Sequence, residues 1–574
     1  MSGALAEALR SNGDDGSPSS GAPGAHVVRT PPTSGGAHER PTQTFEHRAS
    51  EAPEPLVYHR PVPVWNFVRR SVYQDSVTLM RLSHDMEAVP GVRRAAAMMG
   101  TPANRALLAQ AGLLDAEGDD AGPADLVIAV VADCAAAAEA ARVVAEDALT
   151  ARRATSAAGP ARPRTLAGGL RALPGATLAL ISVPGAHAGA EARRALEAGL
   201  HVMLFSDNVS LETEIALKRL ARERGRFLMG PDCGTAIVAG VPLGFANVVP
   251  RGRVGLVAAS GTGLQEVSCR LAAEGEGVSH AIGVGGRDLA DAVGGTMTLA
   301  ALAALADDPA TEVVVVIGKP PGPAVAARLA GTLGALGKPS VLCTAGVDAT
   351  TPVAAPASVH VASTLEDAAH AAVALARGQT PRAMEFTPAP ADVERLVADL
   401  ARGLTRGQRF VRGVYSGGTL AWEAVALLRA RLADVAPGVD GAGDGHRVVD
   451  LGGDAFTVGR PHPMIDGAVR REWIMREAAD PATAVLLLDV VLGHGAHPDP
   501  AGALAPSLAA ARRAAADDSR GLAIVASVTG TEADPQGRSR QMAALRAAGV
   551  VVMDSNAQAA RLAALVAARA SVAS

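Results

Sequence analysis

The stretch VGLVAASGTGLQE (residues 254–266) joins an apolar run to an apolar helical pattern through the small residues Ser260, Gly261 and Thr262. A hydrophobic strand that passes directly into a helix is typical of a parallel α/β sheet. At such a junction, the backbone N–H groups and the positive end of the helix dipole favour an anion. The stretch therefore predicts an α/β fold with a phosphate or carboxylate site at the strand end.

The pattern occurs a second time as GVYSGGTLAWE (residues 413–423), and the agreement extends beyond this turn. IGVGGRD (282–288) is echoed by VDLGGD (449–454), the apolar runs 313–318 and 485–491 each end in a loop rich in glycine and proline, and 340–344 is matched by 524–528. Four similar elements in the same order indicate an internal duplication. We expect two flavodoxin-like domains, at residues 252–378 and 408–570, with a linker at 379–407.

Three segments precede the duplication. Residues 1–55 are rich in Gly, Ser, Pro and Ala, which predicts a disordered tail. Residues 56–151 alternate strand and helix patterns, including an expected strand at 76–80 and a helix at 82–88, and predict a small α+β domain of ferredoxin-like type. After a polar linker at 152–164, residues 165–251 are expected to form half of a doubly wound, Rossmann-like domain.

Composition narrows the class of function. The net charge of the 574 residues is −5, and no basic cluster is interleaved with aromatic residues, which argues against binding to nucleic acid or to an anionic membrane surface. The four cysteines lie far apart without CxxC spacing, which argues against a disulfide framework and a zinc knuckle. Without a secretory signal pattern or an apolar run long enough to span a bilayer, we expect a cytoplasmic protein.

Several motifs resemble the succinyl-CoA synthetase superfamily. GPDC (230–233), SGT (260–262), GVGG (283–286) and VIG (316–318) resemble the α subunit of ADP-forming acyl-CoA synthetases. The chain is identified more closely as a member of the FdrA family by MMGTPAN (98–104), MGPDCGTAI (229–237), HAIGVGGRDL (280–289), HPMID (462–466) and GHGAHPDP (493–500). The resemblance implies a CoA-binding type of half-domain at 165–251, followed by two domains of succinyl-CoA synthetase and ATP-citrate lyase type.

The resemblance also implies site residues. The loop of Asp232, Cys233 and Gly234 and the turn of Ser260, Gly261 and Thr262 match family positions that line the site of the reacting carboxylate or acyl phosphate. The alternative is that residues 230–234 only shape a tight turn and that Cys233 is a small core residue.

Two parts of the synthetase pattern are missing. The synthetases carry a phosphorylated histidine in a Gly-His-Ala-Gly loop after the strand that matches 340–344, whereas AGVDATTP (345–352) has no histidine, and the supporting glutamate is replaced by Lys319. A lysine at this position favours a stably bound anion over a transiently phosphorylated histidine. The glycine-rich CoA loop is also absent, because TLAGGLRAL (165–173) is too short for a strand, loop and helix.

The leading hypothesis is an acyl or carbamoyl transfer that involves phosphate. One FdrA member is similar to a subunit of oxamate carbamoyltransferase, which converts oxalurate and phosphate to oxamate and carbamoyl phosphate in allantoin catabolism. That reaction requires no cofactor, and its partners would be a small carboxylate, phosphate and further protein subunits. The candidate anion-binding residues are Ser260, Thr262, Lys319 and Arg287, together with a second turn formed by Ser416, Gly417 and Thr419.

Other interpretations remain open. Arg287 could cap a turn with Asp288 instead of binding an anion. His462 and His497 are the candidate general bases, although a structural role or a metal site with nearby aspartates are alternatives, and no metal is predicted. The chain could instead be an ADP-forming synthetase that binds CoA and ATP or ADP and carries phosphate on His462 or His497, or a non-catalytic assembly scaffold.

Overall fold

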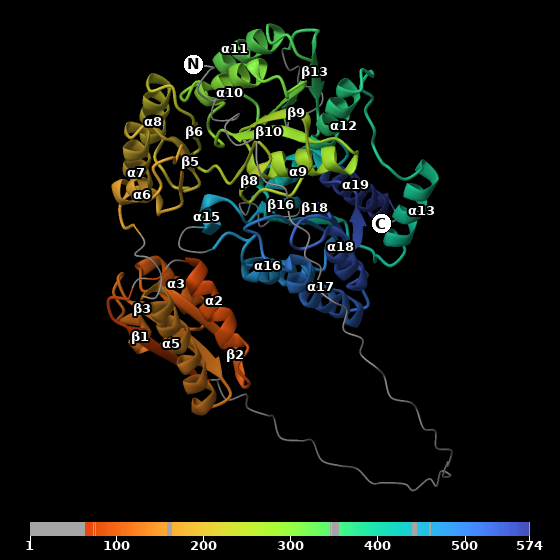
Figure 1. Ribbon diagram of the computed structural model, residues 1–574. Helices are drawn as coiled ribbons and strands as arrows, with labels where there is room; N and C mark the ends of the chain where they lie inside the picture. Colours follow the sequence, from red (N-terminus) through yellow and green to blue (C-terminus); the bar gives the residue numbers. More distant parts are fainter. Residues whose placement is uncertain are drawn as a thin grey trace, which may run out of the picture.

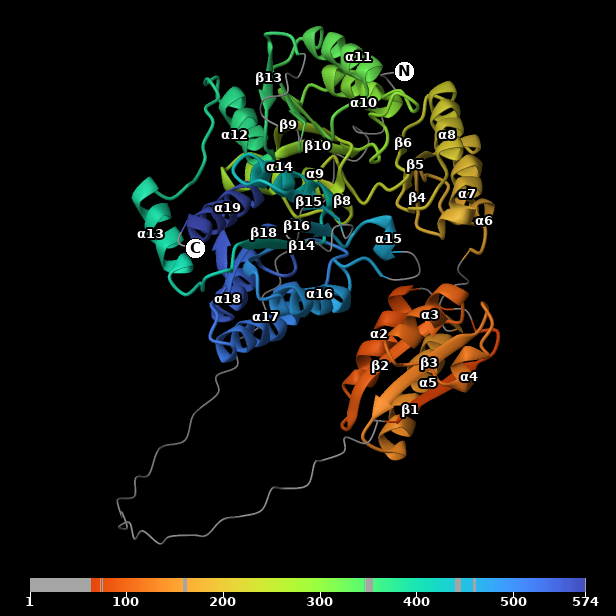
Figure 2. The same ribbon diagram turned by 180° about the vertical axis from the view of Figure 1, so that it is seen from behind.

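The computed structural model describes residues 63–72, 74, 76–157, 163–344, 346, 355–438, 445–457 and 461–572. The expected tail at 1–55 and all of the loop 345–352 except Gly346 lie outside the described residues. The described residues form four sheets, of three, three, seven and six strands (Figures 1 and 2). Helices cover these sheets, and the expected α/β class is confirmed.

The first sheet has the antiparallel order β1-β3-β2, formed by β1 (Val64–Arg69), β2 (Val92–Met99) and β3 (Leu126–Ala132). Helices α2 (Ser76–Glu87) and α5 (Ala135–Ala157) cover one face, whereas α3 (Pro102–Gln110) covers the other and α4 (Ala116–Asp119) contacts β1 and β3.

The strand expected at 76–80 is wrong, because these residues begin α2. Leu79, Leu82 and Met86 recur at helical spacing and pack against the sheet, so one helix accounts for both expected elements. The edge strand β1 was not expected from the sequence.

The second sheet is parallel, with β4 (Leu178–Ile181), β5 (His201–Leu204) and β6 (Leu228–Met229). It is accompanied by α6 (Leu166–Ala172), α7 (Gly185–Glu197) and α8 (Leu211–Glu223). Thr165 caps α6 by accepting from the Gly168 N–H, so residues 165–173 form a short capped helix instead of a phosphate-binding loop.

The third sheet has the order β13-β12-β11-β9-β10-β7-β8. Its parallel strands are β9 (Arg251–Ala258), β10 (Val278–Gly283), β11 (Val313–Gly318), β12 (Ser340–Thr344) and β13 (Val359–Ala362), extended by the antiparallel hairpin of β7 (Thr235–Val238) and β8 (Val241–Gly244). Its helices are α9 (Gly261–Ala273), α10 (Thr296–Asp307), α11 (Pro323–Gly334) and α12 (Leu365–Ala376).

The fourth sheet has the parallel order β15-β16-β14-β17-β18-β19. Its strands are β14 (Phe410–Tyr415), β15 (Val435–Pro437), β16 (His446–Asp450), β17 (Thr483–Val491), β18 (Ala523–Thr529) and β19 (Val551–Met553). Its helices are α13 (Pro390–Ala401), α14 (Gly418–Arg429), α15 (Asp454–Thr457), α16 (Ala468–Ala479), α17 (Pro500–Asp517), α18 (Arg538–Ala547) and α19 (Asn556–Val572). The order β16-β14-β17-β18-β19 reproduces β10-β9-β11-β12-β13, as a duplication requires.

The two repeats face each other through α9, α12, α14 and α19, which contact one another, and both views show α9 and α19 where the two repeats meet (Figures 1 and 2). Two buried glutamates cross this seam in equivalent ways. Glu266 on α9 accepts a hydrogen bond from the backbone N–H of Asn556, the first residue of α19 (3.4 Å). In the same way, Glu423 on α14 accepts from the backbone N–H of Leu365, the first residue of α12 (2.7 Å). The repeats are therefore related by an approximate twofold axis and share one core.

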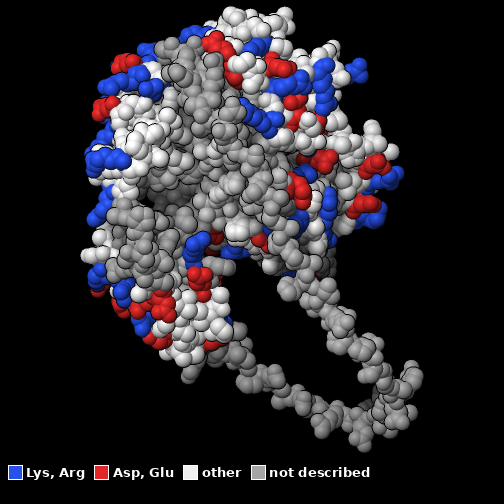
Figure 3. All heavy atoms as spheres, in the orientation of Figure 1, with Lys and Arg blue, Asp and Glu red and all other residues white. Residues whose placement is uncertain are grey.

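The surface agrees with the small net charge. Acidic and basic side chains are interspersed over the face in Figure 3. Within the described part of the chain, no helix is long and apolar enough to cross a membrane.

Candidate functional site

The two predicted anion turns meet at the seam between the repeats. Ser260 accepts from the Gly263 N–H (2.8 Å) as the N-cap of α9, and its hydroxyl donates to the Thr419 hydroxyl (2.6 Å) in the first turn of α14. Gly417 and Thr262 are the equivalents of Ser260 and Thr419 in the other repeat. They are also close together, since a Cβ built on Gly417 would lie 3.0 Å from the Thr262 methyl group. The N-termini of α9 and α14 therefore converge on one point.

The first turn keeps backbone donors for a ligand. The N–H groups of Gly261 and Thr262 lie in the first turn of α9, where an α-helix offers no acceptor. The loop 230–235 faces this turn, because a Cβ on Gly261 would lie 3.4 Å from the Thr235 hydroxyl. The structure thus brings together the two segments that the resemblance implied.

The second turn is different because a buried carboxylate occupies its donors. Asp489, fully buried in β17, accepts from the Ser416 N–H (2.8 Å), the Gly417 N–H (2.7 Å) and the Ser416 hydroxyl (3.0 Å). Arg470 neutralises it at 3.0 Å. The chain's own anion therefore uses the donors that we expected to hold phosphate at Ser416 and Gly417.

Asp489 was not among the residues predicted from the sequence. In the first repeat, the residue equivalent to Asp489 is Ile317. Ile317 of β11 pairs with Ala258, near the end of β9. Asp489 has the same place beside the end of β14, because the preceding residue, Leu488, pairs with Val414. An aspartate within the apolar run 485–491 is the signal that could have found it.

Cys233, within the loop 230–235, is buried, with 3% of its surface exposed. Burial raises the pKa of its thiol to about 12, and the sulfur donates to the Thr235 carbonyl (3.6 Å). A thiolate is therefore strongly disfavoured, and the geometry supports the packing interpretation of Cys233.

We expect Cys233→Ala to retain activity within about twofold and to lose about 1 kcal/mol of stability, the scale of a small core truncation. Parallel measurements of turnover and thermal denaturation test this expectation. Loss of activity in a variant that melts within a few degrees of the native chain would restore a chemical role for the thiol.

Arg287 contributes to the boundary between the β4–β6 unit and the first repeat. Its guanidinium donates to Glu214 (2.8 Å) and to the Val209 carbonyl (2.7 Å). Behind it, buried Lys218 bridges Glu214 (2.8 Å) and Asp288 (2.7 Å). This network favours a structural role for Arg287 over direct anion binding.

Lys319 follows β11 at the carboxyl edge of the sheet, one strand from the Ser260 turn. The side chain is exposed, and its ammonium lies 5.0 Å from the ring centroid of Trp422 on α14. This cation–π contact holds a positive charge where the first repeat meets the start of α14.

His462 lies beside the second turn, since a Cβ built on Gly452 would come 2.5 Å from the Ser416 carbonyl oxygen and 2.7 Å from the His462 Nε2. Its Nδ1 accepts from the Met464 N–H (3.2 Å), and its ring packs 5.9 Å from Phe245. Burial lowers the pKa of His462 to about 4. A neutral imidazole whose Nδ1 accepts a hydrogen bond carries its proton on Nε2, so His462 presents a donor beside Gly452.

His497 has the same hydrogen-bonding pattern. Its Nδ1 accepts from the Asp499 N–H (3.0 Å), and the backbone N–H of His497 donates to the Met464 carbonyl (2.8 Å). Asp499 in turn caps α17. Neutral His462 therefore suits hydrogen-bond donation better than the general-base role expected of it, and the Nδ1 of His497, which would have to take up a proton, is already occupied as an acceptor.

The β4–β6 unit also contacts this region. Phe205 packs 5.3 Å from Phe245, and Asp207 accepts from the Thr457 hydroxyl on α15 (3.5 Å). Both turns, the loop 230–235 and His462 therefore lie close together where three parts of the chain meet.

The buried histidine makes stability depend on pH. The unfolded chain protonates His462 near its ordinary pKa of 6.5, whereas the folded chain resists protonation down to about 4. Between pH 6.5 and pH 4 the unfolded state therefore binds more protons than the folded state. The contribution of His462 to the free energy of unfolding is fully present above pH 6.5 and is lost progressively as the pH falls towards 4. We expect His462→Asn to reduce this slope in denaturant midpoints measured from pH 7 to pH 4.5. Equal slopes for the two proteins would contradict the assignment.

Comparisons with known proteins agree with this architecture. A family model described as CoA-ligase matches residues 414–566, and one described as AllF, heavy metal-associated domain matches residues 62–164. The Uncharacterized protein YahF of Escherichia coli (strain K12) is 39% identical over 499 residues, which cover 85% of this chain and 96% of YahF. Subunit alpha of the ADP-forming succinate–CoA ligase of Staphylococcus aureus (strain N315) is 33% identical over 151 residues, which cover 25% of this chain and 48% of that subunit.

Solved structures resemble the chain more distantly. The apo form of the dinucleotide-forming acetyl-coenzyme A synthetase 1 of Ca. Korarchaeum cryptofilum aligns with a TM-score of 0.29 and 16% identity, over 68% of this chain and 83% of that one. The ATP citrate lyase of Methanothrix soehngenii aligns with a TM-score of 0.32 and 18% identity, over 41% and 45%.

The described residues of the segment that matches the heavy metal-associated model offer no ligand set for a metal. Cys134 is the one cysteine between residues 62 and 164, and it is exposed. Within the described residues, no group of three His, Cys, Asp or Glu side chains is placed to hold an ion. Heavy metals require several such donors, so these residues do not fit a heavy-metal site.

Proposed function

Because the chain belongs to the FdrA-like family of succinyl-CoA synthetase-like proteins, we propose that it transfers a carbamoyl group to inorganic phosphate. The proposed reaction converts oxalurate and phosphate to oxamate and carbamoyl phosphate. One observation carries the proposal: the first turn retains its anion-binding donors, and the loop after β12 has no histidine to receive a phosphoryl group.

The geometry supports a phosphate site at the first turn. Gly261 and Thr262 would donate backbone N–H groups, the Thr262 hydroxyl would add a third donor, and Lys319 would supply positive charge. The second turn would serve as a support, because Asp489 already uses its donors. Asp232 and Gly234, in the facing loop, would border the carbamoyl substrate.

The proposed chemistry is a direct displacement. An oxygen of hydrogen phosphate attacks the carbamoyl carbon of oxalurate and forms a C–O bond. The tetrahedral intermediate then breaks the bond from this carbon to the oxamate nitrogen, and that nitrogen takes up the proton that hydrogen phosphate loses. His462, as a neutral Nε2–H donor, would stabilise an oxygen that becomes negative during this step, and His497 would hold the Met464 segment in place.

The match to the CoA-ligase model favours a second candidate, an ADP-forming acyl-CoA synthetase. That enzyme would need CoA, ATP and a phosphoryl carrier, for which His462 is the candidate. Two observations argue against it: α6 replaces the glycine-rich CoA loop, and His462 is largely buried with its Nδ1 already bonded. In either function the chain would act with further protein subunits, as the subunit named among its relatives does.

Thr262→Val tests the anion turn, because it keeps the shape of the side chain and removes the hydroxyl. A hydrogen bond to a charged ligand contributes about 1.5–3 kcal/mol, so we expect the KM for phosphate to rise about tenfold or more. Thr332→Val on α11, away from the turn, is the matched control. An unchanged KM for phosphate in Thr262→Val would remove the turn from the proposed site.

A further inference from the structure

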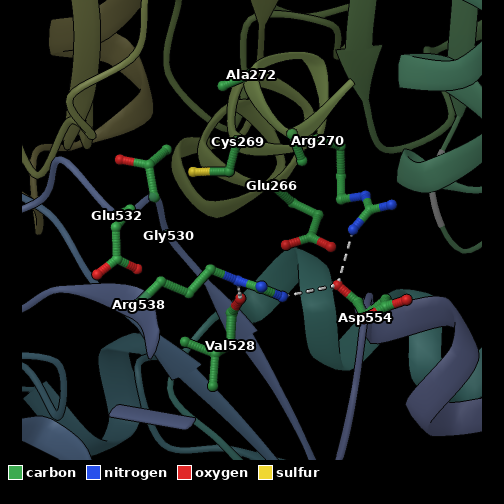
Figure 4. Close-up of a pocket in the computed structure, with 11 residues that line it drawn as sticks. Glu266, Cys269, Arg270, Ala272, Val528, Gly530, Glu532, Arg538 and Asp554 are labelled. Carbon is green, nitrogen blue, oxygen red and sulfur yellow. Dashed lines mark hydrogen bonds between the residues drawn. The ribbon is translucent and has the colours of Figure 1, made fainter. Parts of the chain in front are cut away.

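A separate cavity of about 280 Å³ opens at the seam between the repeats. One wall is α9, with Glu266 and Arg270, and the other is the segment after β18, with Gly530, Glu532 and Arg538 (Figure 4). Arg270 lies ten residues beyond Ser260, or about 15 Å along the helix, so the cavity is distinct from the anion turn. It lies at the carboxyl end of a parallel strand, where ligands of α/β sheets commonly bind.

Two guanidinium groups converge in this cavity. Arg270 donates to the Asp554 carbonyl (3.0 Å), and Arg538 donates to the same carbonyl (3.4 Å) and to the Val528 carbonyl (3.2 Å), as Figure 4 shows. Arg270 is largely buried, and its Nε has no hydrogen-bond partner among the described residues. Backbone oxygens therefore orient two positive charges towards each other.

One of the two arginines has a carboxylate within ion-pair distance. Across the described residues, no carboxylate lies within 4.0 Å of the Arg538 guanidinium, and the carboxylate paired with Arg270 is that of Glu366 at 3.8 Å. Two like charges held together at a partly closed site favour an anion between them.

The two glutamates that line the cavity have other partners. Glu266 accepts from the Thr529 hydroxyl and the Asn556 N–H across the seam. Glu532 accepts from the Ser539 N–H (2.9 Å), and this hydrogen bond holds its pKa below the usual range. The arginines, by contrast, keep unused donors, so the cavity is better suited to an anion than to a cation.

We propose that this cavity is a second ligand site, in which Arg270 and Arg538 bind one small anion that carries a carboxylate or phosphate group. Because Arg270 belongs to the first repeat and Arg538 to the second, the ligand joins the two halves of the molecule. Binding would raise the melting temperature with ligand concentration, since it favours the folded state alone. The inference does not depend on the reaction proposed above.

Calorimetric titration of the full chain with inorganic phosphate and, separately, with succinate tests the site and distinguishes the two ligand groups. Both titrations use the Ser260→Ala, Thr262→Val background, which weakens binding at the anion turn, so that binding at the cavity is recognised by its loss in Arg538→Met. We expect at least one probe to bind with one-to-one stoichiometry, and Arg538→Met to weaken its binding at least tenfold. Arg540→Met, which replaces an exposed arginine on the same helix, should bind as the background protein does.

Absence of binding by both probes, or equal binding in Arg538→Met, would overturn the proposal. If Arg538→Met does not fold, crystals of the unaltered chain soaked in selenate provide the answer. An anomalous peak between the two guanidinium groups is expected, and an empty cavity would refute the site. Loss of carbamoyl transfer in Thr262→Val with this anion still bound would show that the two sites are independent.

Discussion

Replacing Asp489 with alanine is expected to lower the free energy of unfolding by about 3–5 kcal/mol, the usual cost of removing one partner from a buried ion pair. The variant leaves Arg470, 3% exposed, without its carboxylate and leaves the N–H groups of Ser416 and Gly417 without an acceptor. Denaturant unfolding of the full chain, followed by circular dichroism, measures the loss.

The control removes both charges and keeps an acceptor. Arg470→Met combined with Asp489→Asn should be more stable than Asp489→Ala alone, because it leaves no unpaired buried charge. A loss below about 1 kcal/mol for Asp489→Ala would contradict the role of this carboxylate in filling the second turn.

Replacing Lys319 with methionine is expected to lower kcat/KM for phosphate by about 100-fold, since removal of one preorganised charge-stabilising group typically costs 10²–10³. Methionine is unbranched and one heavy atom shorter than lysine, so it keeps most of the apolar side chain but removes the ammonium that contacts Trp422. Stability should change by about 0.5–1 kcal/mol at most, the contribution of an exposed cation–π contact. Steady-state rates at varied phosphate concentration measure the effect.

Arg328→Met, an exposed cation on α11, is the matched control and should leave the rate unchanged. If Lys319→Met and Arg328→Met have the same kcat/KM for phosphate as the unaltered chain, Lys319 does not belong to the anion site.

The large parallel sheets could be predicted because their strands are continuous apolar runs and their order is repeated. Residues 254–258 and 313–318 have this pattern and form β9 and β11. The first sheet was harder to predict: residues 76–80 have a composition that suits a strand, and only the spacing of Leu79, Leu82 and Met86 reveals α2. Local composition therefore misled where helical periodicity decides.

The site could be predicted in part. The turn at Ser260 follows β9 and the loop at Cys233 follows β6, which belong to different sheets. The two segments lie close together because the loop leads directly into β7, which joins the sheet that contains β9. The pairing of Asp489 with the turn at Ser416 depends on register between strands about seventy residues apart, which no local pattern encodes. The same limit applies to Arg287, whose partner Glu214 lies on α8.

The most direct test of the central claim is ³¹P magnetic resonance of the purified chain with its partner subunits, oxalurate and inorganic phosphate. The account predicts a carbamoyl phosphate signal that appears without ATP or CoA and without a phosphorylated protein. Formation of acyl-CoA from succinate, ATP and CoA, together with an acid-labile phosphoprotein and no carbamoyl phosphate, would contradict it.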